Sequence, residues 1–190
     1  MPAVQTNYDE NLGRALLGQV ANPQTCDIDT AIAANDIPFG RAVRNASLGG
    51  VSDDYVRCQL GVTSILPSPF TINSFFGIAV KDPTRDASER GENGDGVDQY
   101  AENDAHVAVL WRGDVWVEVP AADSVSRGNR LNIVLNTGQF TVVAPRAGSS
   151  SILAIGRVGA ATGGRAVKAL SNKTSNNLVL VRLYGDEQII

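Results

Sequence analysis

The residues VLWRGDVWVEV, at positions 109–119, decide how this chain is expected to fold. Apolar side chains recur at every second position on both sides of Gly113-Asp114, and this period of two is typical of β-strands. Glycine tolerates the positive φ that the first central residue of a type II′ turn requires. The stretch therefore predicts a tight hairpin that joins a strand at 106–111 to a strand at 115–119.

The same alternation recurs along the rest of the chain and is interrupted by turn residues about every eight to twelve positions. A second hairpin, with a slightly longer loop at Asn136-Thr137-Gly138, is expected to join strands at 131–135 and 140–142. Further strands are expected at 39–44, 56–60, 75–80, 152–158, 166–170 and 178–184. About ten short strands without a long helix predict an all-β fold, either an antiparallel β-sandwich or a barrel.

Residues 1–35 differ in composition from the rest of the chain. Asn, Gln, Asp and Ala dominate them, and the only helical spacing of apolar residues lies between Leu12 and Val20, before Asn22-Pro23. We expect an extended N-terminal arm at 1–35 with one short helix, followed by a β-rich core domain at 36–190. Because the arm has few apolar anchors, we expect it to become ordered only against a neighbouring subunit.

The most polar stretch is KDPTRDASERGENGDGVD, residues 81–98, which holds six acids and three bases. Asn93, Asp95, Gly96 and Glu102 match the third, fifth, sixth and twelfth positions of a calcium-binding EF-hand loop. Gly91, however, occupies the position of the first acidic ligand, and no amphipathic helix flanks the segment. We therefore expect a long, solvated acidic loop and no metal site.

Charge and hydropathy exclude several classes of partner. The chain has 190 residues, with 16 Lys and Arg against 20 Asp and Glu, so it lacks the positive surface that nucleic acid and anionic membranes attract. No stretch approaches the roughly 20 apolar residues that cross a membrane. We expect one globular unit that binds neither nucleic acid nor membrane.

Side chains for catalysis are scarce. The chain has one histidine, His106, and two cysteines, Cys26 and Cys58, which lack the spacing of a zinc site. Cys58 lies in the alternating run VRCQL and is expected to be buried, without a disulfide. No nucleophile elbow, metalloprotease motif or phosphate-binding loop accompanies His106. We therefore expect neither an enzyme nor a cofactor.

Trp111 and Trp116 flank the predicted turn and are the most conspicuous aromatic residues. Exposed tryptophan is typical of protein interfaces and of platforms that stack on sugars. The alternative is that each tryptophan covers the edge of the core beneath its hairpin. The sequence leaves both interpretations open.

Several segments, taken in order, resemble the tailed-bacteriophage capsid decoration proteins, also called structural cement proteins. The resemblance covers residues 8–184, and the order of the segments carries it, since each alone is also a common strand or turn. These segments are the polar N-terminal arm, IPFGRAV at 37–43, FFGIAV at 75–80, DQY at 98–100, the VLWRGDVWVEV stretch, TGQF at 137–140 and VLVRLYG at 179–185.

The resemblance implies a non-enzymatic protein that binds the major capsid protein on the outer surface of the assembled shell. It implies a homo-oligomer, a trimer rather than a dimer, that is made in the host bacterial cytoplasm and bridges capsomers to stabilise the shell. The alternative is a carbohydrate-binding β-sandwich module of a virion or cell surface, with the tryptophans or Tyr100 as its stacking face. The candidate interaction residues are Tyr8, Leu12, Leu16, Leu17, Trp111 and Trp116.

Overall fold

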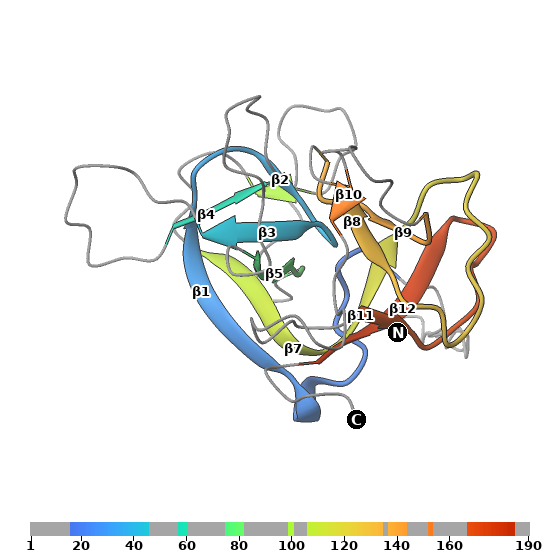
Figure 1. Cartoon of the computed structure of the whole chain (residues 1–190). Helices are drawn as coiled ribbons and strands as arrows, with labels where there is room; N and C mark the ends of the chain where they lie inside the picture. The colour runs from blue at the N-terminus through green and yellow to red at the C-terminus, as the bar shows by residue number, and fades with distance from the viewer. Residues whose placement is uncertain are drawn as a thin grey trace, which may run out of the picture.

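The computed structural model confirms an all-β chain (Figure 1). It describes residues 16–45, 57–60, 75–81, 99–100, 106–134, 137–143, 152–153 and 167–184. Within them lie one short 3₁₀-helix, η1 (Pro23–Thr25), and twelve strands. The strands are β1 (Asp27–Ala33), β2 (Ile37–Pro38), β3 (Ala42–Asn45), β4 (Arg57–Leu60), β5 (Phe75–Ala79), β6 (Gln99–Tyr100), β7 (Val107–Glu118), β8 (Asn132–Val134), β9 (Phe140–Thr141), β10 (Ile152–Leu153), β11 (Val167–Ala169) and β12 (Leu178–Leu183).

The hairpin expected at Gly113-Asp114 is wrong, because β7 is one continuous strand of 12 residues. Gly113 has a φ of 134°, far from the value of about +60° that a type II′ turn needs at this position. The strand bends at Gly113 instead of reversing. The two halves do not pair with each other because each finds other partners: β1 and β5 pair with the first half, and β12 pairs with the second.

A β-bulge at the bend changes which side chains of β7 face each of two hydrophobic cores. The pairing register with β1 shifts between Asp27 and Ile28, which lie opposite Arg112 and Leu110. Before the bulge, odd-numbered residues point into one core, and after it odd-numbered residues point into the other. An extra residue in a strand has this effect because side chains alternate between the two faces.

The first core, here called the ring core, lies inside five strands that pair in the order β1-β4-β3-β5-β7. A further pairing of β7 with β1 closes these strands into a ring. Four of the five pairs are antiparallel, and β1–β4 is parallel. The purely antiparallel arrangement that we expected fails at this pair, because strand directions cannot alternate around a closed ring with an odd number of strands. The ring core contains Ala31, Ala33, Ile37, Phe39, Val43, Cys58, Ala79, Tyr100, Val107 and Val109.

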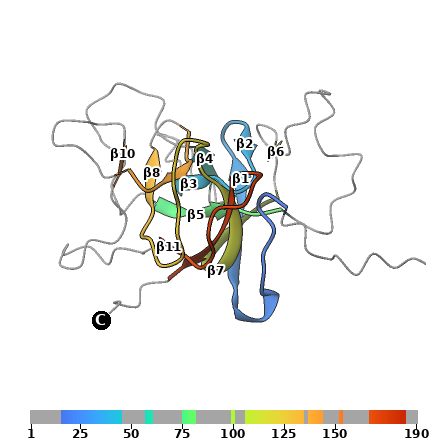
Figure 2. The same ribbon diagram turned by 90° about the vertical axis from the view of Figure 1, so that its right-hand side faces the viewer.

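The second core is built around the other half of β7. This half pairs with β12, and β12 pairs with β11. The outer edge of β11 is bonded to residues 128–131, where the Leu131 amide donates to the Val167 carbonyl at 3.0 Å. The hairpin expected near 136–138 is confirmed, since β8 pairs antiparallel with β9. Figure 2 shows β8 and β10 on one side of the molecule and β2 and β6 on the other.

Part of the stretch expected as an arm belongs to the folded sheet. Residues 27–33 form β1, and residues 18–21 run along the second half of β7. The Gly18 amide donates to the Trp116 carbonyl at 2.8 Å, and the Trp116 amide donates to the Gln19 carbonyl at 3.0 Å. No helix covers residues 16–20. The expectation of an arm fails for these segments because backbone hydrogen bonds, which cannot be inferred from hydropathy, hold them in the sheet. Residues 1–15 lie outside the described residues.

Cys58 is buried in the ring core, as its sequence pattern predicted, and both cysteines are free. Burial raises the pKa of the Cys58 thiol to about 12. Cys26 is only half-buried, and its thiol donates to the Pro23 carbonyl. The acidic loop expected at 81–98 lies outside the described residues from position 82 onward.

Replacing Gly113 should destabilise the fold. A Cβ at this position would lie 2.8 Å from Cβ of Cys26, in addition to the strain of a positive φ. We expect Gly113→Ala to lower the free energy of unfolding by about 2–4 kcal/mol in urea denaturation. The matched control is Gly128→Ala, since Gly128 also has a positive φ, of 93°, and a Cβ there would meet no atom within 4 Å. Equal losses for the two variants would show that the contact with Cys26 is unimportant.

Removing residues 1–35 should abolish folding of the chain. The deletion removes β1, which opens the ring and exposes Val107 and Val109 of the ring core. Removing residues 1–15 leaves β1 and its pairing with β7 in place, so it should leave the thermal midpoint within about 3 °C of the full-length value. Thermal unfolding followed by circular dichroism checks both. A cooperatively folding 36–190 fragment would contradict the role given to β1.

The two cysteines should differ sharply in reactivity. At pH 8 a thiol with a pKa of about 12 is ionised to only about one part in ten thousand, and Cys58 is also shielded from solvent. A disulfide reagent such as DTNB should therefore label one thiol in the native protein and two in denaturant. Mass spectrometry should place the native label on Cys26; rapid native labelling of Cys58 would show that the ring opens readily.

Candidate functional site

The structure places two of the four apolar residues predicted as contacts near the N-terminus. Leu16 is 48% exposed, whereas Leu17 is half-buried and packs against the ring core. Tyr8 and Leu12 lie outside the described residues. Leu16 is therefore the member of this set that the described surface offers to a partner.

Trp111 and Trp116 do not lie opposite each other across a turn, because β7 does not reverse between them. Four residues of the strand lie between them, and the five steps from one to the other correspond to about 16 Å along the backbone. Both side chains are half-buried. The two tryptophans therefore lack the arrangement on one hairpin that the carbohydrate-binding alternative assumed for a sugar-stacking face.

Tyr100 is a core residue rather than a surface aromatic. Its side chain is 1% exposed, and its hydroxyl donates to the Val80 carbonyl at 2.5 Å. The same oxygen accepts from the Ala108 amide at 3.3 Å, and the ring packs edge-on against Phe39 with centroids 5.0 Å apart. These contacts fix the short β2–β6 sheet against β7 and leave no face of Tyr100 for a sugar.

His106 is exposed and directly precedes β7. Among the described residues, no group of three or more His, Cys, Asp or Glu side chains is placed to hold a metal ion. In the same part of the chain, no helix has the length and hydropathy that crossing a membrane requires.

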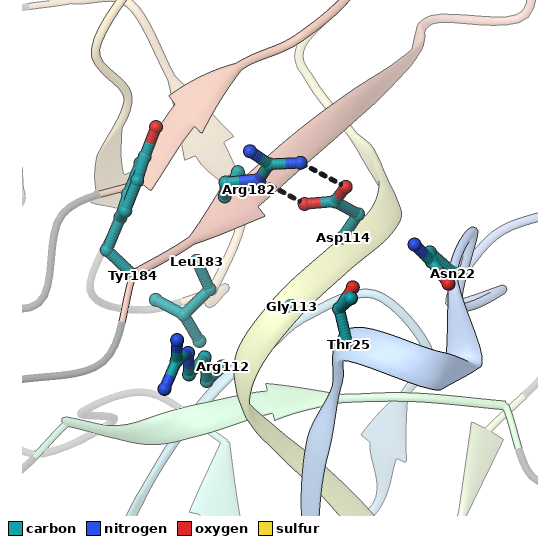
Figure 3. Close-up of a pocket in the computed structure, with 8 residues that line it drawn as sticks. All are labelled: Asn22, Thr25, Arg112, Gly113, Asp114, Arg182, Leu183 and Tyr184. Carbon is teal, nitrogen blue, oxygen red and sulfur yellow. Dashed lines mark hydrogen bonds and ion pairs between the residues drawn. The ribbon is translucent and has the colours of Figure 1, made fainter.

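A pocket of about 270 Å³ lies where the bend of β7 meets η1 and the end of β12 (Figure 3). Three separate parts of the sequence supply its walls, and they meet only because β7 bends here. The pocket is lined by Asn22, Thr25, Arg112, Gly113, Asp114, Arg182, Leu183 and Tyr184.

A bidentate ion pair between Arg182 and Asp114 forms the wall between β7 and β12 (Figure 3). Nε of Arg182 donates to Oδ1 of Asp114 at 2.6 Å, and Nη2 donates to Oδ2 at 2.7 Å. The Asp114 side chain is 10% exposed, and that of Arg182 is 46% exposed. Hydrogen bonding to Asp114 raises the pKa of Arg182 further above its ordinary range, and Tyr184 adds to this shift. Asp114 thus fixes the orientation of a charged guanidinium group.

Sequence reasoning missed this pocket because it placed Gly113-Asp114 in a turn. Within a continuous strand, Asp114 is directly opposite Arg182 in the β7–β12 register. An acid and a base at facing positions of paired strands form a favourable cross-strand pair. The sequence contains this acid and this base, but assigning Gly113-Asp114 to a turn removed Asp114 from the strand in which it faces Arg182.

A second ion pair, between Arg41 and Glu118, lies inside the fold. Nη2 of Arg41 is 2.7 Å from Oε2 of Glu118, and Nε2 of Gln139 donates to the same oxygen at 3.4 Å. Burial lowers the pKa of Arg41, and Glu118 partly offsets this effect. The Arg41 side chain is 15% exposed and that of Glu118 is 35% exposed, and Gln139 connects the pair to the β8–β9 turn.

Comparison with known proteins identifies the family to which this chain belongs. The family model described as structural cement protein (E217 gp24/Pam3 gp6) matches residues 4–184. A chain from a structure of the capsid of Myoviridae phage XM1 has a similar fold, with a TM-score of 0.59 at 18% identity over 97% of this chain and 98% of that one.

A chain of the head fiber gp8.5 N base of bacteriophage phi29 aligns over 87% of this chain and 98% of its own, at 13% identity. Its TM-score of 0.43 is too low to establish a shared fold. Among curated proteins, none matches significantly. Because the family model spans nearly the whole sequence, this chain belongs to the family of phage structural cement proteins, which are capsid-associated structural proteins of the virion.

Proposed function

We propose that this protein binds the outer surface of an assembled phage capsid and bridges neighbouring capsomers. The match of the cement family to residues 4–184 is the observation that carries this proposal. The protein is made in the host bacterial cytoplasm and adds to the shell after assembly. It then stabilises the shell against the pressure of the packaged genome.

The stabilisation follows from mass action. A protein that binds only the assembled shell favours that state by RT ln(1 + [L]/Kd), which is about 2.7 kcal/mol per site at a free concentration of 100 Kd. A symmetric homo-oligomer multiplies this effect, because contacts that are weak singly become strong when several must break together. We favour a trimer over a dimer, since three-fold and quasi-three-fold junctions of a shell match its symmetry.

We also propose that the role is non-enzymatic. The described residues that line the pocket at the bend of β7 include neither histidine nor cysteine, and the carboxylate of Asp114 is bonded to Arg182 through both oxygens. Nucleophilic and acid–base catalysis both need a group whose proton affinity is matched to the reaction. An Asp held in a bidentate pair with Arg is instead typical of a structural or recognition site.

The bridging role that we expected of the whole arm is now proposed for residues 1–15, which include Tyr8 and Leu12. A fully extended segment of this length spans at most about 50 Å, enough to reach a neighbouring subunit. Leu16, exposed where the described chain begins, continues this surface toward the core.

Capsids that lack this protein should bind it and become more stable. We expect added protein to co-sediment with expanded shells and to raise the temperature at which they release DNA. The variant that lacks residues 1–15 should bind more weakly, by about tenfold, at unchanged stability of its own fold. Sedimentation, dye-detected DNA release and circular dichroism measure these three quantities.

Electron cryo-microscopy of the decorated shells would locate the protein and count its copies at each site. Three copies on the outer face around three-fold and quasi-three-fold junctions are expected. Failure of the full-length protein to bind any shell of its own phage would refute the proposed function. Two copies at two-fold positions would refute only the proposed trimer. If the variant that lacks residues 1–15 binds shells as tightly as the full-length protein, only the proposed role of the arm is refuted.

A further inference from the structure

We propose that the outer face of the sheet formed by the second half of β7, β12 and β11 binds residues 1–15 of a neighbouring copy of this chain. This inference rests on the proposed function, because it names the surface that the bridging segment contacts. The surface is a group of apolar side chains that belong to neither of the two described cores. They are Trp116, Leu170, Leu178 and Leu180, here called the apolar patch.

Strand alternation directs the apolar patch away from the second core. On β7, Trp116 lies between two valines that are buried in that core, and on β12, Leu180 lies between two more. Successive side chains of a strand point to opposite faces of the sheet, so both residues point outward. All four side chains of the patch are half-buried. Each therefore keeps apolar surface that a partner can cover.

The pairing of the strands joins these side chains into one surface. Leu180 lies directly opposite Trp116 in the β7–β12 pair. The Leu170 amide, directly after β11, donates to the Leu180 carbonyl at 2.7 Å. Leu178 is two residues before Leu180 and so lies on the same face of β12. Residues at facing and alternate positions are neighbours on a sheet, and a tryptophan among them is typical of a protein interface.

Residues 1–15 join the fold at the edge of the apolar patch. The Trp116 amide donates to the Gln19 carbonyl at 3.0 Å, which places Gln19 beside the patch. The Gln19 amide donates to the Leu16 carbonyl at 3.0 Å, and the Leu16 amide donates to Oε1 of Gln19 at 3.2 Å. This turn holds Leu16, whose side chain is 48% exposed, close to Gln19. The N-terminal segment thus starts next to a surface of the chemistry that it needs.

The sequence of the segment fits an apolar partner. Val4, Tyr8 and Leu12 precede Leu16 at intervals of four residues. Residues at this spacing share one face of a strand, and they also share one face of a helix. In either conformation the segment presents a stripe of apolar side chains, and burying that stripe against the apolar patch is favourable.

A neighbouring copy is the source of the segment that we choose, because the protein is proposed to bridge subunits. A segment that lay on its own sheet would bridge nothing. When each copy passes its N-terminal segment to the next around a closed ring, every segment and every apolar patch is used once. The same contact is then repeated in each subunit, which strengthens the assembly.

Disulfide trapping in concentrated solution, without shells, tests the contact. One protein carries Leu12→Cys and a second, isotope-labelled protein carries Leu180→Cys. Both carry Cys26→Ser, so that the buried Cys58 is the one natural thiol left. Oxidised glutathione converts two thiols that meet into a disulfide and is itself reduced to two glutathione thiols. Mass spectrometry should find position 12 linked to position 180 across two copies.

Thr30→Cys is the matched control for position 180, since Thr30 is exposed and lies on β1. It should link to position 12 at least about tenfold less. Equal linking at positions 30 and 180 would overturn the proposal, because it would show contact without specificity. A variant with both Leu12→Cys and Leu180→Cys that links only within one chain would also overturn it, since the segment would then cover its own sheet.

Shell binding distinguishes the segment from the shell protein as the occupant of the apolar patch. Leu180→Ser should weaken binding by about tenfold, as loss of residues 1–15 does. Combining the two changes should weaken binding by about tenfold again in total, because both remove the same contact. A combined loss of about a hundredfold would overturn the proposal, since patch and segment would then act on different partners.

Val143→Ser is the control for this substitution, since Val143 is 46% exposed and lies outside the apolar patch. It should bind shells within about twofold of the unchanged protein. Thermal unfolding must show that Leu180→Ser folds as the unchanged protein does. Failure of the unchanged protein to bind any shell would refute the proposed function. Absence of the link between positions 12 and 180, in a protein that does bind shells, would refute only this inference.

Discussion

The close approach of Gly113 to Cys26 is the constraint on which the rest of the fold depends. A strand of 12 residues would normally serve one sheet, but β7 serves two groups of strands because it bends at this glycine. Any side chain at position 113 would lie against the start of β1. The bend and the β-bulge beside it direct one half of the strand into the ring core and the other half into the second core.

The sequence predicted the fold class well because apolar residues alternate along any strand that has one face on the core and the other in solvent, whichever strands it pairs with. The strands near 56–60, 75–80 and 178–184 and the β8–β9 hairpin all lie where that pattern placed them. β1 was missed because its first half is exposed and carries Asp27 and Asp29 in place of an apolar stripe. Backbone pairing with β7 holds this exposed half of β1, and no residue type encodes such pairing.

The candidate site was not predictable once Gly113 had been assigned to a turn. A glycine beside an aspartate fits a hairpin, and it also fits a bend with an acid facing a base on the next strand. The local residues do not choose between the two, since the choice depends on whether β1, β5 and β12 cover the edges of β7. Arg182 lies 68 positions from Asp114, and only the completed sheet brings the two together.

The pairing of β1 with β7 also has a consequence for how the chain reaches its native state. The paired residues are far apart in sequence, for example Ala31 with Val107, so the ring cannot close until most of the chain has left the ribosome. Long-range strand pairing of this kind makes folding slow and leaves strand edges exposed in the meantime. Acidic side chains on an edge oppose association with other chains. Asp27 and Asp29 therefore place negative charge on β1, which opposes its association with other chains before β7 pairs with it.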